Sequence, residues 1–227
     1  MTTDVIIVDQ PESGVSRITM NRPEKRNSLI HTLRGAILDT LAANDQDPDV
    51  RVTIIRGAGT CFSAGYDLGG GNEGLERPFY TPGGDGSWPR HVTEGWMGIW
   101  DLAKPVIAQV HGYCLAGGSE LATGCDLVYV ADDATIGFPS IPAGAGLIGQ
   151  TWAWHVGPHR AKWLSFLPGS QITGKESETM GWATRAFPAA DLEEETFGYA
   201  RRIAKVPADL LRIKKLSINR VMDVQGF

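Results

Sequence analysis

Residues 104–126, KPVIAQVHGYCLAGGSELATGCD, are the stretch that decides the fold of this chain. Residues 105–110 form a short apolar run of strand length that is rich in β-branched side chains. A turn-like tract follows, and residues 116–122 predict the first turns of a helix. A strand that leads into a glycine-rich helix start directs unpaired backbone N–H groups, and the positive end of the helix dipole, toward the adjacent cleft.

Glu120 follows directly on a pair of glycines, Gly117 and Gly118, whose missing side chains let a ligand approach the backbone closely. An N–H donor for a developing oxyanion beside an acid/base carboxylate is what carbonyl activation requires. The alternative is a tightly packed strand-to-helix corner in which Glu120 only stabilises the helix N-terminus. On this stretch alone, the alternative is favoured.

The composition is that of an ordinary globular protein, with 42% apolar and 21% charged residues among 227. The net charge of −5 gives no reason to expect a nucleic acid or an anionic membrane as partner. Cys61, Cys114 and Cys125 are an odd number without close pairing, which favours a reducing compartment. No signal-peptide pattern and no run of membrane-spanning length is seen, so we expect a cytoplasmic protein.

Strands that alternate with helices predict α/β layering with mainly parallel pairing. Short apolar runs at 5–8 and 15–20 predict a hairpin, and Asn27 or Ser28 is expected to cap the helix that follows. We also expect a long loop over 69–89. Further strands are expected at 52–55 and 127–131, and helices at 30–41, 92–100, 152–163 with a break at 157–158, 176–182, 192–205 and 208–222.

Two glycine patterns match the dinucleotide fingerprint G-x-G-x-x-G, at residues 69–74 and 144–149. Neither follows a predicted strand early in a βαβ unit, which argues against a nicotinamide enzyme. His155 and His159 are separated by a Gly-Pro pair that would break a helix, so they are not predicted as a ligand pair. We predict no metal and no cofactor.

Four motifs in order resemble one family. They are ITMNRP at 18–23, FSAGYDL at 62–68, KPVIA at 104–108 with GGSEL at 117–121, and CD at 125–126. This set is similar to the enoyl-CoA hydratase/isomerase (crotonase) superfamily. The resemblance implies an α/β fold, the crotonase-like ββα spiral of the ClpP/crotonase fold, over residues 1–190 and a helical C-terminal region over 191–227. It also implies a homotrimer or a dimer of trimers.

The same resemblance implies a coenzyme A thioester substrate and an oxyanion hole made by the backbone N–H groups of Tyr66 and Gly117, with Glu120 as the catalytic carboxylate. In this scheme coenzyme A is part of the acyl-CoA or enoyl-CoA substrate, and not a cofactor. The implied substrate-binding residues are Lys25, Arg26, Ala64, Tyr66, Asp67, Leu68, Tyr113 and Gly117. Lys25 and Arg26 are suited to pairing with phosphate.

Ser140 marks a departure from the family pattern. In the segment of residues 138–140, FPS, hydratases of this family carry a second glutamate directly after the proline. This chain has Ser140 at that position, after Pro139. A serine hydroxyl can position water but exchanges no proton near neutral pH, so we expect weak or absent hydration and better isomerisation. The alternatives are thioester hydrolysis, C–C cleavage, or a silent acyl-CoA-binding member. The chain also ends before the family's last helices, as expected of a fragment or a short member.

Overall fold

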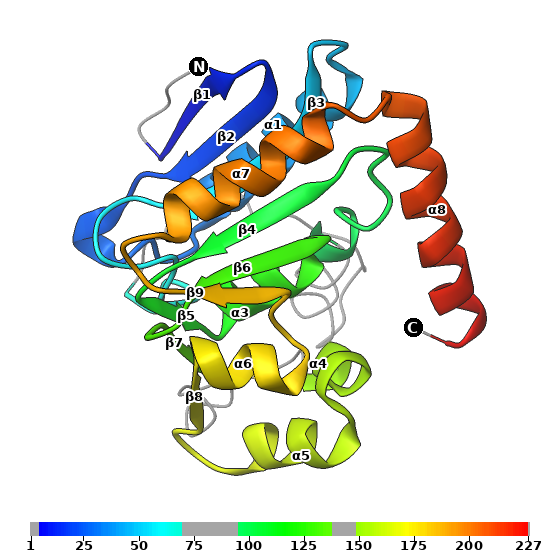
Figure 1. The fold of residues 1–227 in the computed structure, drawn as a ribbon. Helices are drawn as coiled ribbons and strands as arrows, with labels where there is room; N and C mark the ends of the chain where they lie inside the picture. Colours follow the sequence, from blue (N-terminus) through cyan, green and yellow to red (C-terminus); the bar gives the residue numbers. More distant parts are fainter. Residues whose placement is uncertain (1–4, 70–94, 138–148, 227) are drawn as a thin grey trace, which may run out of the picture.

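The computed structural model describes residues 5–69, 95–137 and 149–226. Its main sheet has six strands in the order β1-β2-β3-β4-β6-β9, and a second sheet has the order β5-β7-β8 (Figure 1). The strands are β1 (Ile6–Glu12), β2 (Gly14–Met20), β3 (Val50–Gly57), β4 (Val106–Val110), β5 (Tyr113–Leu115), β6 (Leu127–Ala131), β7 (Thr135–Gly137), β8 (Gln171–Thr173) and β9 (Arg185–Phe187).

The helices connect strands that are mostly parallel. In the main sheet only β1 and β2 pair antiparallel, as a hairpin that turns at Gly14 with φ +79°, and the other pairs are parallel. The predicted hairpin and the predicted parallel α/β layering are therefore confirmed. The helices are the 3₁₀ turn η1 (Pro23–Lys25), α1 (His31–Gln46), α3 (Gly117–Gly124), α4 (Gly149–Val156), α5 (Pro158–Phe166), α6 (Gly174–Met180), α7 (Leu192–Ala204) and α8 (Ala208–Val224).

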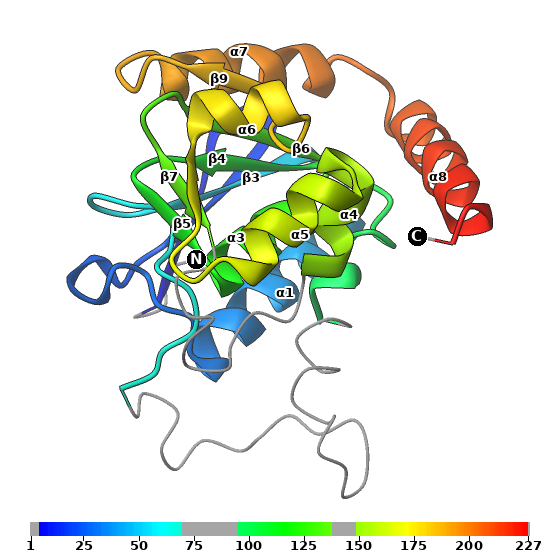
Figure 2. The same ribbon diagram turned by 90° about the horizontal axis from the view of Figure 1, so that it is seen from below.

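Helices cover both faces of the main sheet. Helix α7 crosses one face, over β2, β3 and β4, while α1 and α3 lie on the other (Figures 1 and 2). The core between α1 and the sheet is apolar, and α1 contributes the buried side chains of Leu33, Ile37 and Leu41 to it. Helix α8 continues beyond α7 and stands apart from the sheet (Figures 1 and 2). The predicted boundary between residues 190 and 191 stays a prediction.

The predicted helix cap is wrong. Helix α1 has Ile30 at its N-cap with no side-chain cap hydrogen bond. Asn27 is instead fully buried, and its amide donates to the carbonyls of Ala58 at 2.9 Å and Cys61 at 2.8 Å. These bonds hold the turn after η1 against the end of β3. The predicted break at 157–158 is confirmed, since α4 ends at Val156 and α5 begins at Pro158.

Several predicted features lie outside the described residues. They are most of the loop over 69–89, the first residues of the helix expected at 92–100, and nearly all of both G-x-G-x-x-G patterns. Within the described ranges, no helix is long and apolar enough to cross a membrane. In the same ranges, no three histidine, cysteine or acidic side chains gather as a metal site would need.

Candidate active site

The corner between β5 and α3 is a strained piece of backbone. Ala116, the residue before α3, has φ +45° and ψ −118°, a backbone conformation that residues other than glycine rarely adopt. Its N–H donates to the carbonyl of Gly137 at 2.9 Å, and its own carbonyl accepts the N–H of Glu120 at 3.1 Å. Such strain persists where the surroundings fix it, often at functional sites.

The loop of residues 62–68 lies directly against this corner. The Ser63 N–H donates to the Tyr113 carbonyl at 3.0 Å, and the Leu115 N–H donates to the Ser63 carbonyl at 3.0 Å. Gly65 has φ +98°, and a Cβ there would lie 2.8 Å from the Leu115 carbonyl oxygen and 3.3 Å from the Gly117 nitrogen. Only glycine therefore fits at position 65, and the two motifs predicted to form the site are adjacent in space.

The two predicted oxyanion donors, Tyr66 and Gly117, lie on these adjacent segments. Gly117 is the first residue of α3, so its N–H has no partner within the helix. No described residue accepts a hydrogen bond from it. Leu29 pairs with the backbone on either side of Tyr66. Its N–H donates to the Gly65 carbonyl at 2.8 Å, and its carbonyl accepts the N–H of Asp67 at 3.2 Å. The N–H of Tyr66 therefore points away from Leu29.

Glu120 is buried in the first turn of α3, with 4% of its surface exposed. Its carboxylate accepts a hydrogen bond from the Tyr66 hydroxyl, and the Trp96 indole N–H donates to that hydroxyl oxygen at 3.1 Å. Burial raises the pKa of Glu120 to about 7, although the hydrogen bond from Tyr66 and the charge of Arg34 act to lower it. Glu120 is thus poised to take and give protons near neutral pH.

Arg34 and Trp96 are members of this cluster that we did not predict from the sequence. Arg34 comes from α1 and is 3% exposed. Its guanidinium carbon lies 6.0 Å from the centre of the Tyr66 ring and 5.9 Å from that of Trp96, within the range of cation–π attraction. The available signal was an arginine on the apolar face of a predicted helix, beside Leu33 and Ile37.

The residues expected at the coenzyme A end lie together at the surface. Lys25 and Arg26 are exposed at the end of η1, and the Arg26 guanidinium carbon lies 5.9 Å from the centre of the Tyr113 ring, which is 44% exposed. The Ala64 N–H donates to the Arg26 carbonyl at 2.9 Å. Leu68 is 78% exposed. The predicted substrate-binding residues therefore extend from the buried carboxylate to a basic surface turn.

Asp67 is bound within the protein itself. Its carboxylate pairs with Arg22 at 3.1 Å and accepts hydrogen bonds from the Ser28 hydroxyl at 3.0 Å and the Gly69 N–H at 2.9 Å. Burial would raise the pKa of Asp67, but these three partners together hold it below its usual value. The described contacts fasten the loop to the turn after β2, and substrate contact by Asp67 stays a prediction. Ser140, also predicted as catalytic, lies outside the described residues.

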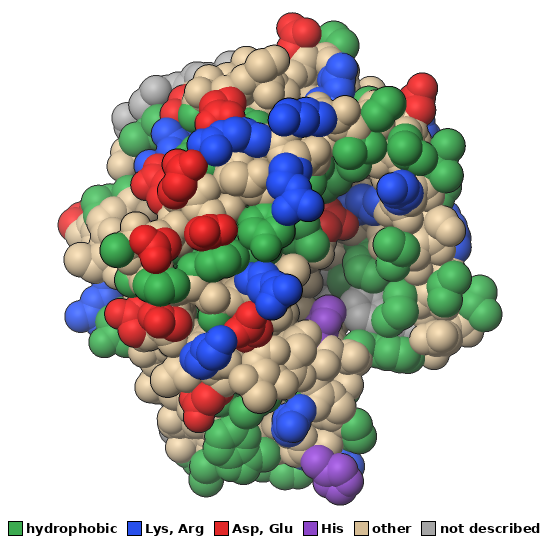
Figure 3. Space-filling model, in the orientation of Figure 1, with side chains coloured by type: hydrophobic (Ala, Val, Ile, Leu, Met, Phe, Trp, Pro, Cys, Tyr) green, Lys and Arg blue, Asp and Glu red, His purple; other side chains and the backbone are tan. Residues whose placement is uncertain are grey.

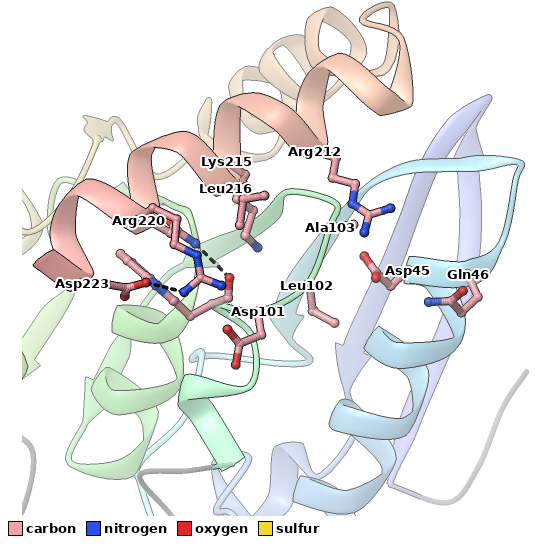
Figure 4. A pocket seen from close by; sticks show the side chains of 12 residues that line it. Asp45, Gln46, Asp101, Leu102, Ala103, Arg212, Lys215, Leu216, Arg220 and Asp223 are labelled. Atoms are coloured by element: carbon pink, nitrogen blue, oxygen red, sulfur yellow. Dashed lines mark hydrogen bonds and ion pairs between the residues drawn. The ribbon is translucent and has the colours of Figure 1, made fainter.

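A separate cavity of about 360 Å³ lies between α8, the end of α1 and residues 100–103 (Figure 4). Its charged lining includes Asp45, Arg212 and Lys215, and an ion pair joins Arg220 to Asp223 at 2.8 Å. Neither Glu120 nor Tyr66 lines it. The candidate acid/base residues therefore lie outside this cavity, at the corner before α3.

Comparisons with known proteins identify the family that this chain matches. The family described as enoyl-CoA hydratase/isomerase matches residues 10–226. The hydroxycinnamoyl-CoA hydratase-lyase of Pseudomonas fluorescens is 32% identical over an alignment of 227 positions, which covers 94% of this chain and 78% of that protein.

Solved structures are similar over nearly the whole chain. An enoyl-CoA hydratase/isomerase from Xanthobacter autotrophicus has a TM-score of 0.89 at 34% identity, covering 99% of this chain and 82% of that one. An enoyl-CoA hydratase from Mycobacterium smegmatis has a TM-score of 0.87 at 32% identity, covering 99% of this chain and 80% of that one. These likenesses confirm the predicted fold class.

Proposed function

Because this chain belongs to the enoyl-CoA hydratase/isomerase family of enzymes, we propose that it acts on the acyl group of a coenzyme A thioester through an enolate, with Glu120 as the acid/base group. The observation that carries the proposal is the position of Glu120. It is a buried carboxyl group with a pKa raised to about 7, one turn after the N–H of Gly117, which has no hydrogen-bond acceptor among the described residues. Proton transfer near neutral pH beside an oxyanion donor is the chemistry of enolate formation.

In the proposed reaction, the thioester oxygen accepts hydrogen bonds from the N–H groups of Tyr66 and Gly117. These donors stabilise the negative charge that moves onto this oxygen as the enolate forms. Glu120 exchanges the proton that the reaction moves. Because both donors are backbone groups held by fixed segments, they need little reorganisation when charge develops.

The coenzyme A portion would lie over the surface that Lys25, Arg26, Ala64, Leu68 and Tyr113 form. A basic turn beside an exposed aromatic ring suits phosphate and adenine, through charge-assisted hydrogen bonds and stacking. Coenzyme A is then part of the substrate. A homotrimer or a dimer of trimers belongs to the same proposal, on the strength of the family resemblance.

A second reaction has one specific observation in its favour. The relative from Pseudomonas fluorescens is named a hydratase-lyase and aligns with 94% of this chain. C–C cleavage after hydration would use the same oxyanion donors and a single carboxylate, so it is the runner-up to plain hydration or isomerisation. A silent acyl-CoA-binding member would keep the binding surface and show no turnover.

The test compares wild type with Glu120→Gln, with crotonyl-CoA turnover and coenzyme A affinity measured on the same samples. We expect Glu120→Gln to lower turnover by about 10²–10⁴-fold, the usual contribution of a positioned acid/base group, with little change in affinity. Glu195→Gln is the matched control, because Glu195 is exposed on α7. Turnover that is indifferent to Glu120→Gln would overturn the assignment, and affinity without any turnover would favour the silent member.

A further inference from the structure

The side chain of Tyr66 stands between the predicted oxyanion donor and the carboxylate. A Cβ placed on Gly117 would lie 2.6 Å from Cε2 and 2.7 Å from Cζ of Tyr66, so the ring rests directly on this glycine. The hydroxyl at the end of the ring donates to Glu120. Tyr66 is half-buried while Glu120 is 4% exposed, so the phenol covers the carboxylate on the side of Gly117.

Two further groups hold the phenol in place. The indole N–H of Trp96 donates to the Tyr66 oxygen at 3.1 Å, which leaves that oxygen as acceptor from Trp96 and donor to Glu120. The buried guanidinium of Arg34 lies 6.0 Å from the centre of the Tyr66 ring. A neutral donor and a cation both favour negative charge that develops on the phenol oxygen. A ring that only filled space would need neither the hydrogen bonds to Glu120 and Trp96 nor the cation beside it.

From this geometry we infer that Tyr66 is a catalytic residue whose hydroxyl is the second proton-transfer group of the reaction. The Tyr66 hydroxyl donates a proton to C2 of the acyl group, and Glu120 accepts the proton of the attacking water. The inference rests on the proposed function. It also supplies a partner for Glu120 in a chain whose second glutamate is replaced by Ser140. The backbone N–H of Tyr66 then donates to the thioester oxygen, while its hydroxyl gives a proton to C2 of the same acyl group.

In hydration, each proton that leaves one group has a defined acceptor. The water oxygen bonds to C3 while its proton passes to Glu120, and the C2=C3 electron pair shifts to form the enolate, with charge on the thioester oxygen. The enolate then collapses, and C2 takes the proton of the Tyr66 hydroxyl. The proton on Glu120 passes to the Tyr66 oxygen. One water has been added across C2=C3, and both side chains have returned to their starting states.

The electrostatics of the pair explain why the transfers follow this order. Burial raises the pKa of Tyr66 far above its usual value, and the charge of Glu120 and the hydrogen bond to it raise it further. With Glu120 ionised, the phenol therefore keeps its proton. Once Glu120 has taken the proton of water, the repulsive charge is gone and Glu120 becomes the donor to the Tyr66 oxygen. The hydroxyl proton is then free to turn toward C2.

The first experiment uses Tyr66→Phe, which removes the hydroxyl and keeps the ring on Gly117. We expect crotonyl-CoA turnover to fall by about 10²–10⁴-fold with KM nearly unchanged. Tyr199→Phe is the matched control, because it removes a phenol hydroxyl on α7 beside Tyr129. Trp96→Phe, which removes the donor to the phenol oxygen, should give a smaller loss. A Tyr66→Phe variant that turns over like wild type would overturn the inference.

A second experiment keeps the inference testable whatever the rate of hydration. Exchange of the C2 protons of butyryl-CoA in heavy water, followed by proton NMR, needs no chemistry at C3. We expect Tyr66→Phe to abolish this exchange, and to raise the pKa of Glu120 because a hydrogen bond that lowers it is lost. If Glu120→Gln is inactive while Tyr66→Phe exchanges at the wild-type rate, the proposed function stands and the role of Tyr66 is wrong. If neither variant differs from wild type, both are wrong.

Discussion

The corner before α3 and helix α8 both bury polar residues, but in different surroundings. At the corner, Glu120 and Tyr66 are polar groups enclosed by apolar core and joined by hydrogen bonds. Helix α8 also turns polar residues inward, since Lys215 and Asn219 are buried and bind the carbonyls of Ile99 and Trp100, both at 2.9 Å. Leu211 is the buried large apolar residue of α8 in the described structure, while six others face outward: Leu210, Ile213, Leu216, Ile218, Val221 and Val224 (Figure 3).

At the corner, the buried polar groups form a candidate site for proton transfer. At α8, they anchor the helix through hydrogen bonds and an ion pair. The core supplies the burial that raises the pKa of Glu120, whereas α8 gains little from apolar burial within this chain. Lys215 pairs at 2.9 Å with Asp126, the last residue of the stretch 104–126. The helix is therefore fastened to the far end of the segment that forms the corner.

The largest expected effect on stability comes from breaking this anchor. Lys215→Met leaves the carboxylate of Asp126 largely buried without its cation, and removing one partner of a buried pair costs about 3–5 kcal/mol. Urea unfolding measures the loss. Arg220→Met is the control, because an exposed pair is worth about 0–1 kcal/mol. The double variant Lys215→Met/Asp126→Asn should recover most of the loss, and equal losses in all three variants would show that α8 is not anchored by this charge.

The next effect is on turnover at the corner. Gly117→Pro removes one N–H donor at a helix position that tolerates proline, and loss of such a donor lowers turnover by about 10²–10³-fold. Gly117→Ala separates sterics from hydrogen bonding, since it keeps the N–H but also meets the Tyr66 ring. Circular dichroism controls for folding. A folded Gly117→Pro variant with the turnover of Gly117→Ala would contradict the assignment of this donor.

The motifs of the sequence located the corner, the loop of residues 62–68 and Glu120, because glycines that permit close contact leave a local pattern. The pairing of Tyr66 with Glu120 spans 54 residues and depends on long-range contacts that no local pattern records. The strands β5, β7, β8 and β9 were missed for a related reason. Each has three residues, which is too short to show an alternation of apolar and polar side chains.

The tryptophans of the C-terminal half illustrate the same limit. In the sequence, tryptophans of the segment 152–182 fit core packing and a subunit interface equally well. Trp152 and Trp182 stack at 4.8 Å between ring centres and are 1% and 4% exposed, so these two belong to the core. Trp154 and Trp163 are 42% and 46% exposed. The predicted trimer, if formed, must draw its apolar contacts from other surfaces than the stacked pair.

The smallest effect is expected on the outer face of α8. Ile213 is 63% exposed, so Ile213→Ser should change the free energy of unfolding by less than about 0.5 kcal/mol. Urea unfolding at low concentration checks this, with Ile37→Ser, a core substitution in α1, as the contrast. Light scattering on the same variant shows whether this face contributes to an assembly. A loss for Ile213→Ser as large as that for Ile37→Ser would show that the face is covered in solution.

The pH dependence of turnover tests the central claim, that Glu120 is the acid/base group, most directly. Wild-type kcat/KM with crotonyl-CoA is measured on both sides of pH 7, together with Glu120→Gln. Burial raises the pKa of Glu120 to about 7, so its carboxylate is the minor form below that pH and the major form above it. Activity that needs the carboxylate should therefore rise with an apparent pKa near 7 in wild type, and this step should be missing from the residual activity of Glu120→Gln. The same step in both proteins would contradict the account.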